Sequence, residues 1–196
     1  MFGDKWNDHI RLLPHDRVFR RLIEPLIPSW LLPNHLTVLR IFLIPLVLYF
    51  LHIKSYDIGV PLFMFAALTD SFDGSLARVR KQITEWGIKY DPLADKLLIG
   101  SVLFVIVLQH INYYLGIALL VTEAVMIIGA WWRQRRGKVE PANFWGKLKM
   151  VTEVVGISLL LLALWFDISL LVEVSAGTLA LALAVAIVSI LSRLHT

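Results

Sequence analysis

The chain has 196 residues, of which 58% are hydrophobic and 17% are charged, and a formal net charge of +4. This composition excludes an ordinary soluble domain and indicates one membrane domain over residues 1–196, with lipids rather than nucleic acid around it. Because the chain contains no cysteine, neither a disulfide framework nor a thiolate metal site is available. Charged residues occur throughout residues 1–30, so we expect no cleavable signal peptide.

Residues 1–32 are expected to form an interfacial segment. Apolar residues recur at helical spacing on both sides of Pro14, and arginines are interleaved with the second set. The apolar positions are Phe2, Trp6, Ile10, Leu13, Val18, Leu22 and Leu26, and the arginines are Arg17, Arg20 and Arg21. This pattern predicts a bent amphipathic juxtamembrane helix on an anionic membrane surface. A solvated helix that packs on a partner is the alternative.

Six apolar stretches between residues 34 and 193 predict an all-α bundle of six transmembrane helices, with Asn34 as the N-cap of the first. The second stretch has only about a dozen apolar residues before Asp70, whereas a span needs about 20. Its helix must therefore continue through Asp70 and Asp73 to about Arg78. The predicted helices cover residues 36–53, 58–78, 87–109, 113–132, 145–165 and 170–191.

The basic residues predict the orientation of this bundle. With both termini on one side, Lys54 alone of the 19 lysines and arginines falls in a loop on the opposite side. By the positive-inside rule, the termini and the loops after the second and fourth helices face the cytoplasm. We therefore expect a multi-pass protein of the cell (inner) membrane with a cytoplasmic active site.

Seven charged residues are expected at one depth in the membrane. Counted back from the outer helix ends at 1.5 Å per residue, they lie about 18 to 27 Å from the outer boundary. They are Arg40, Asp70, Asp73, Asp91, Asp95, Lys147 and Lys149. Isolated charges at that depth are costly, so this layer is predicted to be a polar cavity with a function.

The four aspartates suit a pair of divalent cations. Asp70 and Asp73 are spaced i,i+3, and Asp91 and Asp95 i,i+4, so each pair shares one helix face. Carboxylates brought together without cations would repel one another, and oxygen ligands favour Mg²⁺ or Mn²⁺. Four aspartates are enough to hold two such ions in the arrangement that stabilises phosphoryl displacement.

Small residues beside the aspartates support a ligand site. Gly74, Ala77 and Gly87 leave the helix surface bare, and Arg78 can offer its planar fork to a diphosphate. The same carboxylates would also suit an ion-coupled transporter or a structural salt-bridge cluster. Neither alternative requires glycine and alanine at these positions.

The aspartates and the small residues beside them form one sequence signature, DxxDGxxAR followed after eight residues by GxxxDxxxD. It is formed by Asp70, Asp73, Gly74, Ala77, Arg78, Gly87, Asp91 and Asp95. With this signature the chain resembles the CDP-alcohol phosphatidyltransferase family over residues 33–153. The resemblance implies a homodimer of six-helix subunits with a two-metal site open to the cytoplasm.

The resemblance also implies a role for each position. Asp70 and Asp91 would contact both metals, Asp73 would complete one site, and Asp95 the other. Asp95 would also act as the general base that lets an acceptor hydroxyl attack the β-phosphate of CDP-diacylglycerol and expel CMP. The CDP-lipid would be bound by Asn34, Thr37, Gly74, Ala77, Arg78 and Gly87.

Three further segments resemble the phosphatidylglycerophosphate synthase branch of this family. They are PNHLTVLR at 33–40, DPLADK at 91–96 and GKLK at 146–149. They favour glycerol 3-phosphate as acceptor, its phosphate bound by Arg40, Arg136, Lys147 and Lys149. The lysines could instead serve only the positive-inside rule. Inositol phosphate, or phosphatidylglycerol as in a cardiolipin synthase, are the alternative acceptors.

Two departures from that branch concern the acceptor rather than the phosphotransfer core. Its bacterial members commonly have Arg-Glu where this chain has Thr122 and Glu123, and a threonine where Met150 stands. Glu123 thus lacks an adjacent cation and must find another partner in the membrane or stay protonated.

Overall fold

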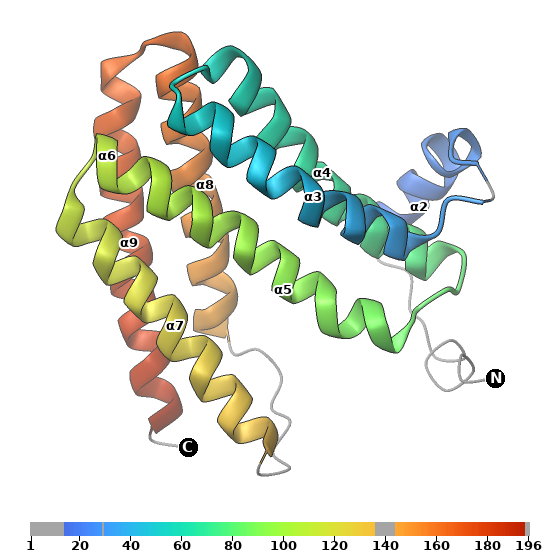
Figure 1. Cartoon of the computed structure of the whole chain (residues 1–196). Coiled ribbons are helices and arrows are strands. Elements are labelled where there is room, and N and C mark those ends of the chain that lie inside the picture. Colours follow the sequence, from blue (N-terminus) through green and yellow to red (C-terminus); the bar gives the residue numbers. More distant parts are fainter. Residues whose placement is uncertain (1–13, 29, 136–143, 195–196) are drawn as a thin grey trace. The chain divides into compact units, whose positions relative to one another are not determined.

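A computed structural model describes residues 14–28, 30–135 and 144–194, and these residues form helices and no strand. The long helices are α3 (Pro33–His52), α4 (Tyr56–Val79), α5 (Glu85–Val102), α7 (Tyr113–Arg135), α8 (Phe144–Phe166) and α9 (Ser169–Leu194). The π turn η2 (Leu103–Val107) and α6 (Leu108–His110) extend α5 (Figure 1). The predicted helix positions are confirmed within a few residues, and α4 does continue through Asp70 and Asp73.

The described chain divides into two compact units. The first contains residues 14–28, 30–49 and 61–98, and the second contains residues 50–60, 99–135 and 144–194. The first unit therefore holds α2 (Pro14–Leu22), the 3-10 turn η1 (Glu24–Leu26) and most of α3, α4 and α5. The four aspartates of the signature all lie in this first unit.

Three of the described helices have the length and apolarity of a membrane span. Within the described ranges these are α3, α8 and α9, with hydropathy values of 1.7, 1.9 and 2.4. α4 and α5 carry the aspartates, and the apolar part of α7 is shorter, Tyr113–Gly129. The finding supports a membrane protein, while six spans remain a prediction.

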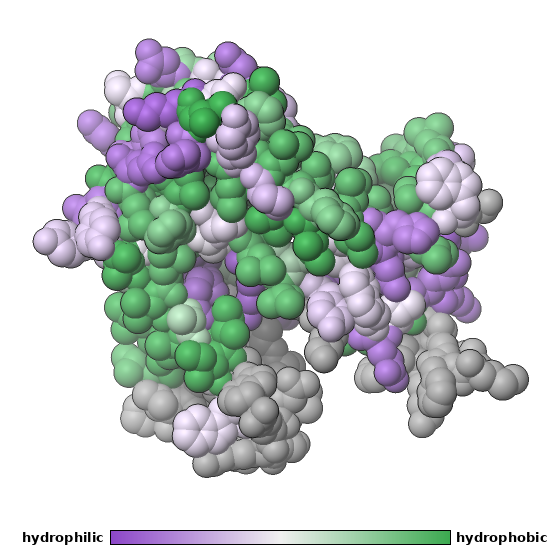
Figure 2. Space-filling view, in the orientation of Figure 1, coloured by the Kyte–Doolittle hydropathy of each residue, from purple (hydrophilic) through white to green (hydrophobic). Residues whose placement is uncertain are grey.

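Large hydrophobic side chains cover much of the surface. Figure 2 shows hydrophobic residues over most of the visible face of the described helices. Exposed examples are Phe42, Tyr49, Phe104, Phe166, Leu170 and Leu181. Apolar patches of this extent would aggregate in water, so lipid is the expected surrounding of these helices.

The first unit is centred on a small apolar core where α2 packs on α4. Phe19 of α2 is buried with Leu36 and Leu76, and its ring centroid lies 5.7 Å from that of Phe72. The neighbouring Val18 of α2 remains exposed. Residues 1–13 of the predicted interfacial segment lie outside the described residues, and the described α2 is a helix with one docked and one exposed face.

The end of α4 turns the chain toward α5 without a glycine. Lys81 adopts φ 54°, the left-handed conformation. Gln82 N donates to Ala77 O at 2.9 Å and Lys81 N to Arg78 O at 3.4 Å, which is the Schellman pattern of helix C-termini. Thr84 then caps α5, since its Oγ1 accepts the Gly87 N–H at 3.0 Å. Both ends of the connection are therefore held by hydrogen bonds.

The second unit contains the antiparallel hairpin of α8 and α9. Gly156 packs against Leu179, and Ser175 Oγ donates to Gly156 O at 2.8 Å. At the end of α8, Trp165 Nε1 donates to Asp57 Oδ1 at 3.1 Å, which attaches the turn of residues 50–60 to this helix.

Candidate active site

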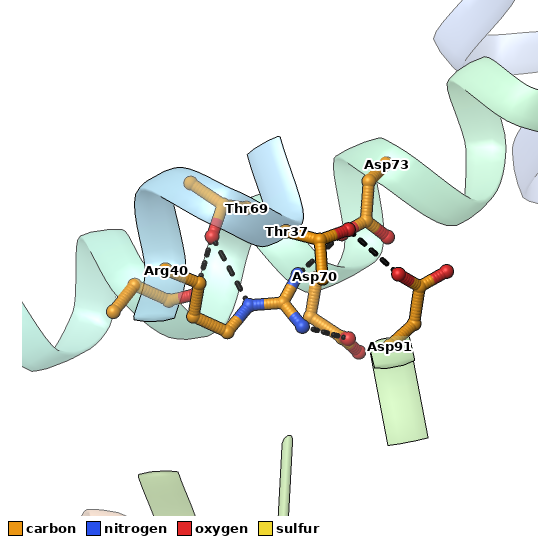
Figure 3. A network of polar contacts seen from close by, with 7 residues as sticks. Thr37, Arg40, Thr69, Asp70, Asp73 and Asp91 are labelled. Atoms are coloured by element: carbon orange, nitrogen blue, oxygen red, sulfur yellow. Dashed lines mark hydrogen bonds and ion pairs between the residues drawn. The ribbon is translucent and has the colours of Figure 1, made fainter. Parts of the chain in front are cut away.

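Arg40 is the centre of a polar cluster between α3 and α4. Its side chain is fully buried, and it donates from Nη1 to Asp70 Oδ1 at 2.6 Å and from Nη2 to Asp73 Oδ2 at 2.5 Å. Its Nε donates to Thr69 Oγ1 at 3.3 Å, and that hydroxyl donates to Ala66 O at 2.6 Å. Figure 3 shows the guanidinium between these groups. The planar fork of arginine can contact three groups at once, which a lysine ammonium could not do in this geometry.

Thr37 connects the same cluster to α5. It lies one turn before Arg40, and its Oγ1 is 2.6 Å from Asp91 Oδ1 and 3.2 Å from Asp73 Oδ2 (Figure 3). A hydroxyl has a single hydrogen, so it donates to one carboxylate at a time. Asp73 and Asp91, from two different helices, are thereby brought to one oxygen atom.

The cluster contains more negative than positive charge. Three carboxylates, Asp70, Asp73 and Asp91, surround the single guanidinium of Arg40. The Asp70 side chain is 41% exposed while that of Arg40 is fully buried, so the cluster is open on the Asp70 side. A further cation entering there would be attracted by the excess charge.

The donor set of this cluster fits a hard divalent cation. All of its acceptors are carboxylate or hydroxyl oxygens, the ligands that Mg²⁺ and Mn²⁺ prefer. In the part of the chain that the structure describes, no three acidic or histidine side chains already converge on one metal position. Figure 3 shows Arg40 and Thr37 between the carboxylates, in contact with them. Asp95 lies one turn beyond Asp91 on α5 and is half-buried.

A cavity of about 200 Å³ lies next to the cluster in the first unit. Five of the six residues predicted to bind a CDP-lipid line it, and Asp91 belongs both to its wall and to the carboxylate cluster. The sixth, Thr37, contacts Asp91 instead. The predicted lining residues are Asn34, Gly74, Ala77, Arg78 and Gly87, and Pro33, Gln82, Ile83, Thr84 and Ile88 complete the wall.

Gly87 lies at a crowded part of this wall. A Cβ atom there would lie 3.2 Å from Asp91 Oδ2, 3.2 Å from Thr84 Oγ1 and 3.3 Å from Asn34 Oδ1. Thr84 Oγ1 also donates to Asn34 Oδ1 at 2.9 Å, so the first turns of α3 and α5 are joined. A larger residue at position 87 would push these polar groups apart.

Two lining residues have features that the sequence did not indicate. Arg78 forms a two-bond ion pair with Asp16 of α2, from Nε to Oδ2 at 2.8 Å and from Nη2 to Oδ1 at 2.9 Å. Gln82 Oε1 is buried and accepts no hydrogen bond from the described residues. Asp16 is separated from Arg78 by 62 positions and belongs to no motif, so only the packing of α2 reveals it.

The residues predicted to bind the acceptor phosphate have other surroundings. Arg40 contacts Thr69 and two aspartates, as described above, and Arg136 lies outside the described residues. Lys147 is exposed on α8 in the second unit. Lys149 is 2% exposed and pairs with Glu123 of α7 and with Glu153 Oε2 at 2.5 Å. Glu123 therefore has a cationic partner in Lys149 of α8, although no arginine stands next to it in the sequence.

Comparison with known proteins agrees with this geometry. Residues 30–190 match the family model of the CDP-alcohol phosphatidyltransferases. A CDP-diacylglycerol–glycerol-3-phosphate 3-phosphatidyltransferase of Pseudomonas fluorescens is 32% identical, with 66% of this chain and 71% of the relative covered. Enzymes of the same name are 32% identical in Rickettsia typhi (67% and 76% covered) and 30% identical in Mycoplasma pneumoniae (75% and 74%). With three of the signature aspartates gathered beside a cavity that its small residues line, and with this match over most of its length, the chain belongs to the CDP-alcohol phosphatidyltransferase family.

Proposed function

We propose that this protein is a phospholipid-synthesis enzyme that transfers a phosphatidyl group from CDP-diacylglycerol to glycerol 3-phosphate and releases CMP. The observation that carries the proposal is the shared wall residue Asp91. It joins a carboxylate cluster suited to phosphoryl transfer to a cavity lined by the glycine, alanine and arginine of the signature. The relatives named above carry this activity in their names. An ion-coupled transporter would use the carboxylates but has no need of the adjacent cavity.

The enzyme family generally depends on divalent metal ions, and we propose that Asp70, Asp73, Asp91 and Asp95 hold two of them, Mg²⁺ or Mn²⁺. When bound, these ions would neutralise the diphosphate of the donor and stabilise the departing CMP. The support is the excess of carboxylates over cations and the oxygen-only donor set around Thr37.

The cavity is proposed to bind the polar head of the donor. Its volume of about 200 Å³ suits part of a nucleotide but not two acyl chains, which would remain in the membrane. Arg78 can donate to the diphosphate, and the bare surfaces of Gly74 and Ala77 let the ligand approach the helix backbone. The buried Gln82 Oε1 is an acceptor for a donor group of the nucleotide, since it has no described partner.

Asp95 is proposed as the general base. It would take the proton of the glycerol 3-phosphate hydroxyl as that oxygen attacks the β-phosphorus, and the bond from this phosphorus to the CMP oxygen would break. An exposed carboxylate is a weak base near neutral pH, so correct placement of the two reactants must supply much of the acceleration. The half-buried position of Asp95, one turn from Asp91, is compatible with this role.

The acceptor phosphate is proposed to bind Lys147 and Arg136, together with Arg40 and Lys149 as the sequence predicts. Among these, Lys147 has the most accessible charge in the described structure. Arg40 and Lys149 are each paired with carboxylates, so their contribution to phosphate binding requires rearrangement of those pairs.

The arrangement in the membrane is also a proposal. The whole chain is taken as one domain, with six spans, both termini on the cytoplasmic side of the inner membrane, and a homodimer as the assembly. The exposed Arg17, Arg20 and Arg21 of α2 and the nearby exposed Val18 and Leu22 support contact of this helix with an anionic lipid surface.

The function is tested with purified protein in detergent, CDP-diacylglycerol and Mn²⁺. CMP release should require an acceptor, and glycerol 3-phosphate should be the best of a panel that also contains inositol phosphate and phosphatidylglycerol. Asp95→Asn should abolish turnover and leave binding of the CDP-lipid measurable. Faster release with another acceptor would reassign the acceptor, and release with none of them would refute the enzyme assignment.

A further inference from the structure

The carboxylate of Asp16 is fully buried although it lies on the short helix α2, near the start of the described chain. Both of its oxygens accept hydrogen bonds from Arg78, at 2.8 and 2.9 Å, in the paired geometry in which arginine binds a carboxylate most strongly. Burying a carboxylate is costly unless it is paired in this way. The position of Asp16 is therefore set by Arg78, and that of Arg78 by Asp16.

The ion pair fixes which edge of the Arg78 guanidinium meets the cavity. Asp16 contacts the Nε and Nη2 edge, while Nη1 is the atom nearest to the surface of Gly74, 3.4 Å from where a Cβ would stand. Both Gly74 and Arg78 line the cavity. An arginine side chain has several freely rotating bonds, so holding one edge removes conformations in which the other edge points elsewhere.

Attachment of the N-terminal segment does not depend on Asp16 alone. Arg80, two residues beyond Arg78, donates to Glu24 Oε1 at 3.2 Å. It also donates to the carbonyl oxygens of Ile27 at 2.8 Å, Leu31 at 3.1 Å and Pro28 at 3.3 Å. Phe19 adds its buried ring. Among the described residues, two arginine–carboxylate pairs join the same segments, and of these the Asp16 pair includes a residue of the cavity wall.

We propose that Asp16 is a positioning residue, which holds Arg78 in the orientation that binds the diphosphate of the CDP-linked donor. This inference rests on the proposed function for the identity of that ligand. Asp16 itself does not touch the reacting atoms. Its effect should therefore fall on donor binding and not on the acceptor or on the chemical step.

The test compares Asp16→Asn with Glu24→Gln, two variants that each remove one carboxylate charge from an arginine of α4 or its C-terminal turn. Asp16→Asn should raise the KM for CDP-diacylglycerol about tenfold, the value of one lost charge-assisted contact, with the KM for glycerol 3-phosphate unchanged. Glu24→Gln should leave both KM values unchanged. Equal effects of the two variants, or an effect of Asp16→Asn on kcat alone, would reduce Asp16 to a structural attachment.

A second variant pair tests whether Asp16 acts through Arg78. Arg78→Gln should raise the donor KM, and adding Asp16→Asn to it should raise that KM no further, because neighbouring residues that act as one unit are not additive. A further multiplicative rise would overturn the proposal. If Asp16→Asn does not fold, Asp16→Glu decides, since displacing the carboxylate by one methylene should raise the donor KM, whereas an unchanged KM would contradict the role.

Titration with CDP separates this inference from the proposed function. The wild-type protein should bind CDP in the presence of Mn²⁺, and Asp16→Asn should bind it about tenfold more weakly. If the wild type binds CDP but releases no CMP with any acceptor, the function fails while the comparison of CDP affinities still decides the role of Asp16. Equal CDP affinities in the two proteins would refute it.

Discussion

Arg40 pairs with two aspartates of the signature between α3 and α4. Its guanidinium lies 2.6 Å from Asp70 and 2.5 Å from Asp73, and none of its side-chain surface is exposed. Breaking a buried ion pair by removal of one partner leaves an uncompensated charge and is strongly destabilising. At the residue scale, the stability of the site and its charge are thus linked through one side chain.

We therefore expect Arg40→Gln to lower the free energy of unfolding by about 3–5 kcal/mol and to reduce turnover by about 100-fold. Added Mn²⁺ should raise the unfolding temperature of this variant more than that of the wild type, because a divalent cation supplies the missing positive charge. Thermal unfolding in detergent with and without Mn²⁺ measures the two effects on stability, and CMP release measures turnover. Arg40→Lys is the control, since it keeps the charge but cannot span three partners. An unaltered unfolding temperature in Arg40→Gln would contradict this account.

The two lysines of the GKLK segment differ in burial and in their partners. Lys149 is buried between Glu123 and Glu153, whereas Lys147 is exposed. Lys149→Met should cost about 3–5 kcal/mol, because the buried carboxylate of Glu153 and the partly buried one of Glu123 lose their cation. Lys147→Met should change stability by less than about 0.5 kcal/mol and should instead raise the KM for the phosphorylated acceptor.

Thermal unfolding and acceptor titration of the two variants distinguish these roles. Combining Lys149→Met with Glu123→Leu and Glu153→Leu should recover most of the lost stability, since apolar replacements of a whole buried ionic cluster are well tolerated. If Lys149→Met raises the KM for the acceptor without loss of stability, Lys149 binds the acceptor phosphate and is not a structural ion-pair residue.

At the scale of helices, the α8–α9 hairpin depends on close approach at Gly156. A methyl group added there would lie 2.8 Å from both Cγ and Cδ2 of Leu179, which is fully buried and cannot move aside freely. We expect Gly156→Ala to destabilise the protein by about 1–3 kcal/mol through overpacking. The measurement is the unfolding temperature in detergent.

Gly177 on α9 provides the matched control. It is exposed, and nothing lies within 4 Å of a Cβ built at this position. Gly177→Ala should therefore stabilise the helix by about 0.5–1 kcal/mol, since alanine restricts the unfolded chain more than glycine. A lower unfolding temperature for Gly156→Ala and a higher one for Gly177→Ala would support the packing of α8 against α9. Changes of the same sign in the two variants would refute it.

At the scale of the whole molecule, the absence of cysteine allows a direct test of orientation. Lys54 and Lys81 are both exposed and share the left-handed backbone conformation, with φ 59° and 54°. In intact cells, a membrane-impermeant maleimide should label Lys54→Cys and should label Lys81→Cys only after lysis. Labelling of Lys81→Cys in intact cells would invert the proposed topology.

The sequence was sufficient to predict the positions of the helices and to place Asp70 and Asp73 within α4. Apolar periodicity and the length needed to cross a membrane are local properties, so they predicted that α4 continues through Asp70 and Asp73. The family resemblance predicted five of the residues that line the cavity, four of which belong to the signature. The turns were harder, because Lys54, Lys81 and Asp167 end helices at positions where glycine is the usual signal.

Only the tertiary structure decided which charges meet. The sequence placed Arg40 and Lys149 at the depth of the aspartates, but it did not show that Arg40 pairs with Asp70 and Asp73 or that Lys149 pairs with Glu123 and Glu153. The Asp16–Arg78 pair joins residues 62 positions apart and had no sequence signal. The physical reason is that periodicity fixes the face of a helix on which a side chain lies, whereas its partner depends on how the helices rotate and pack against one another.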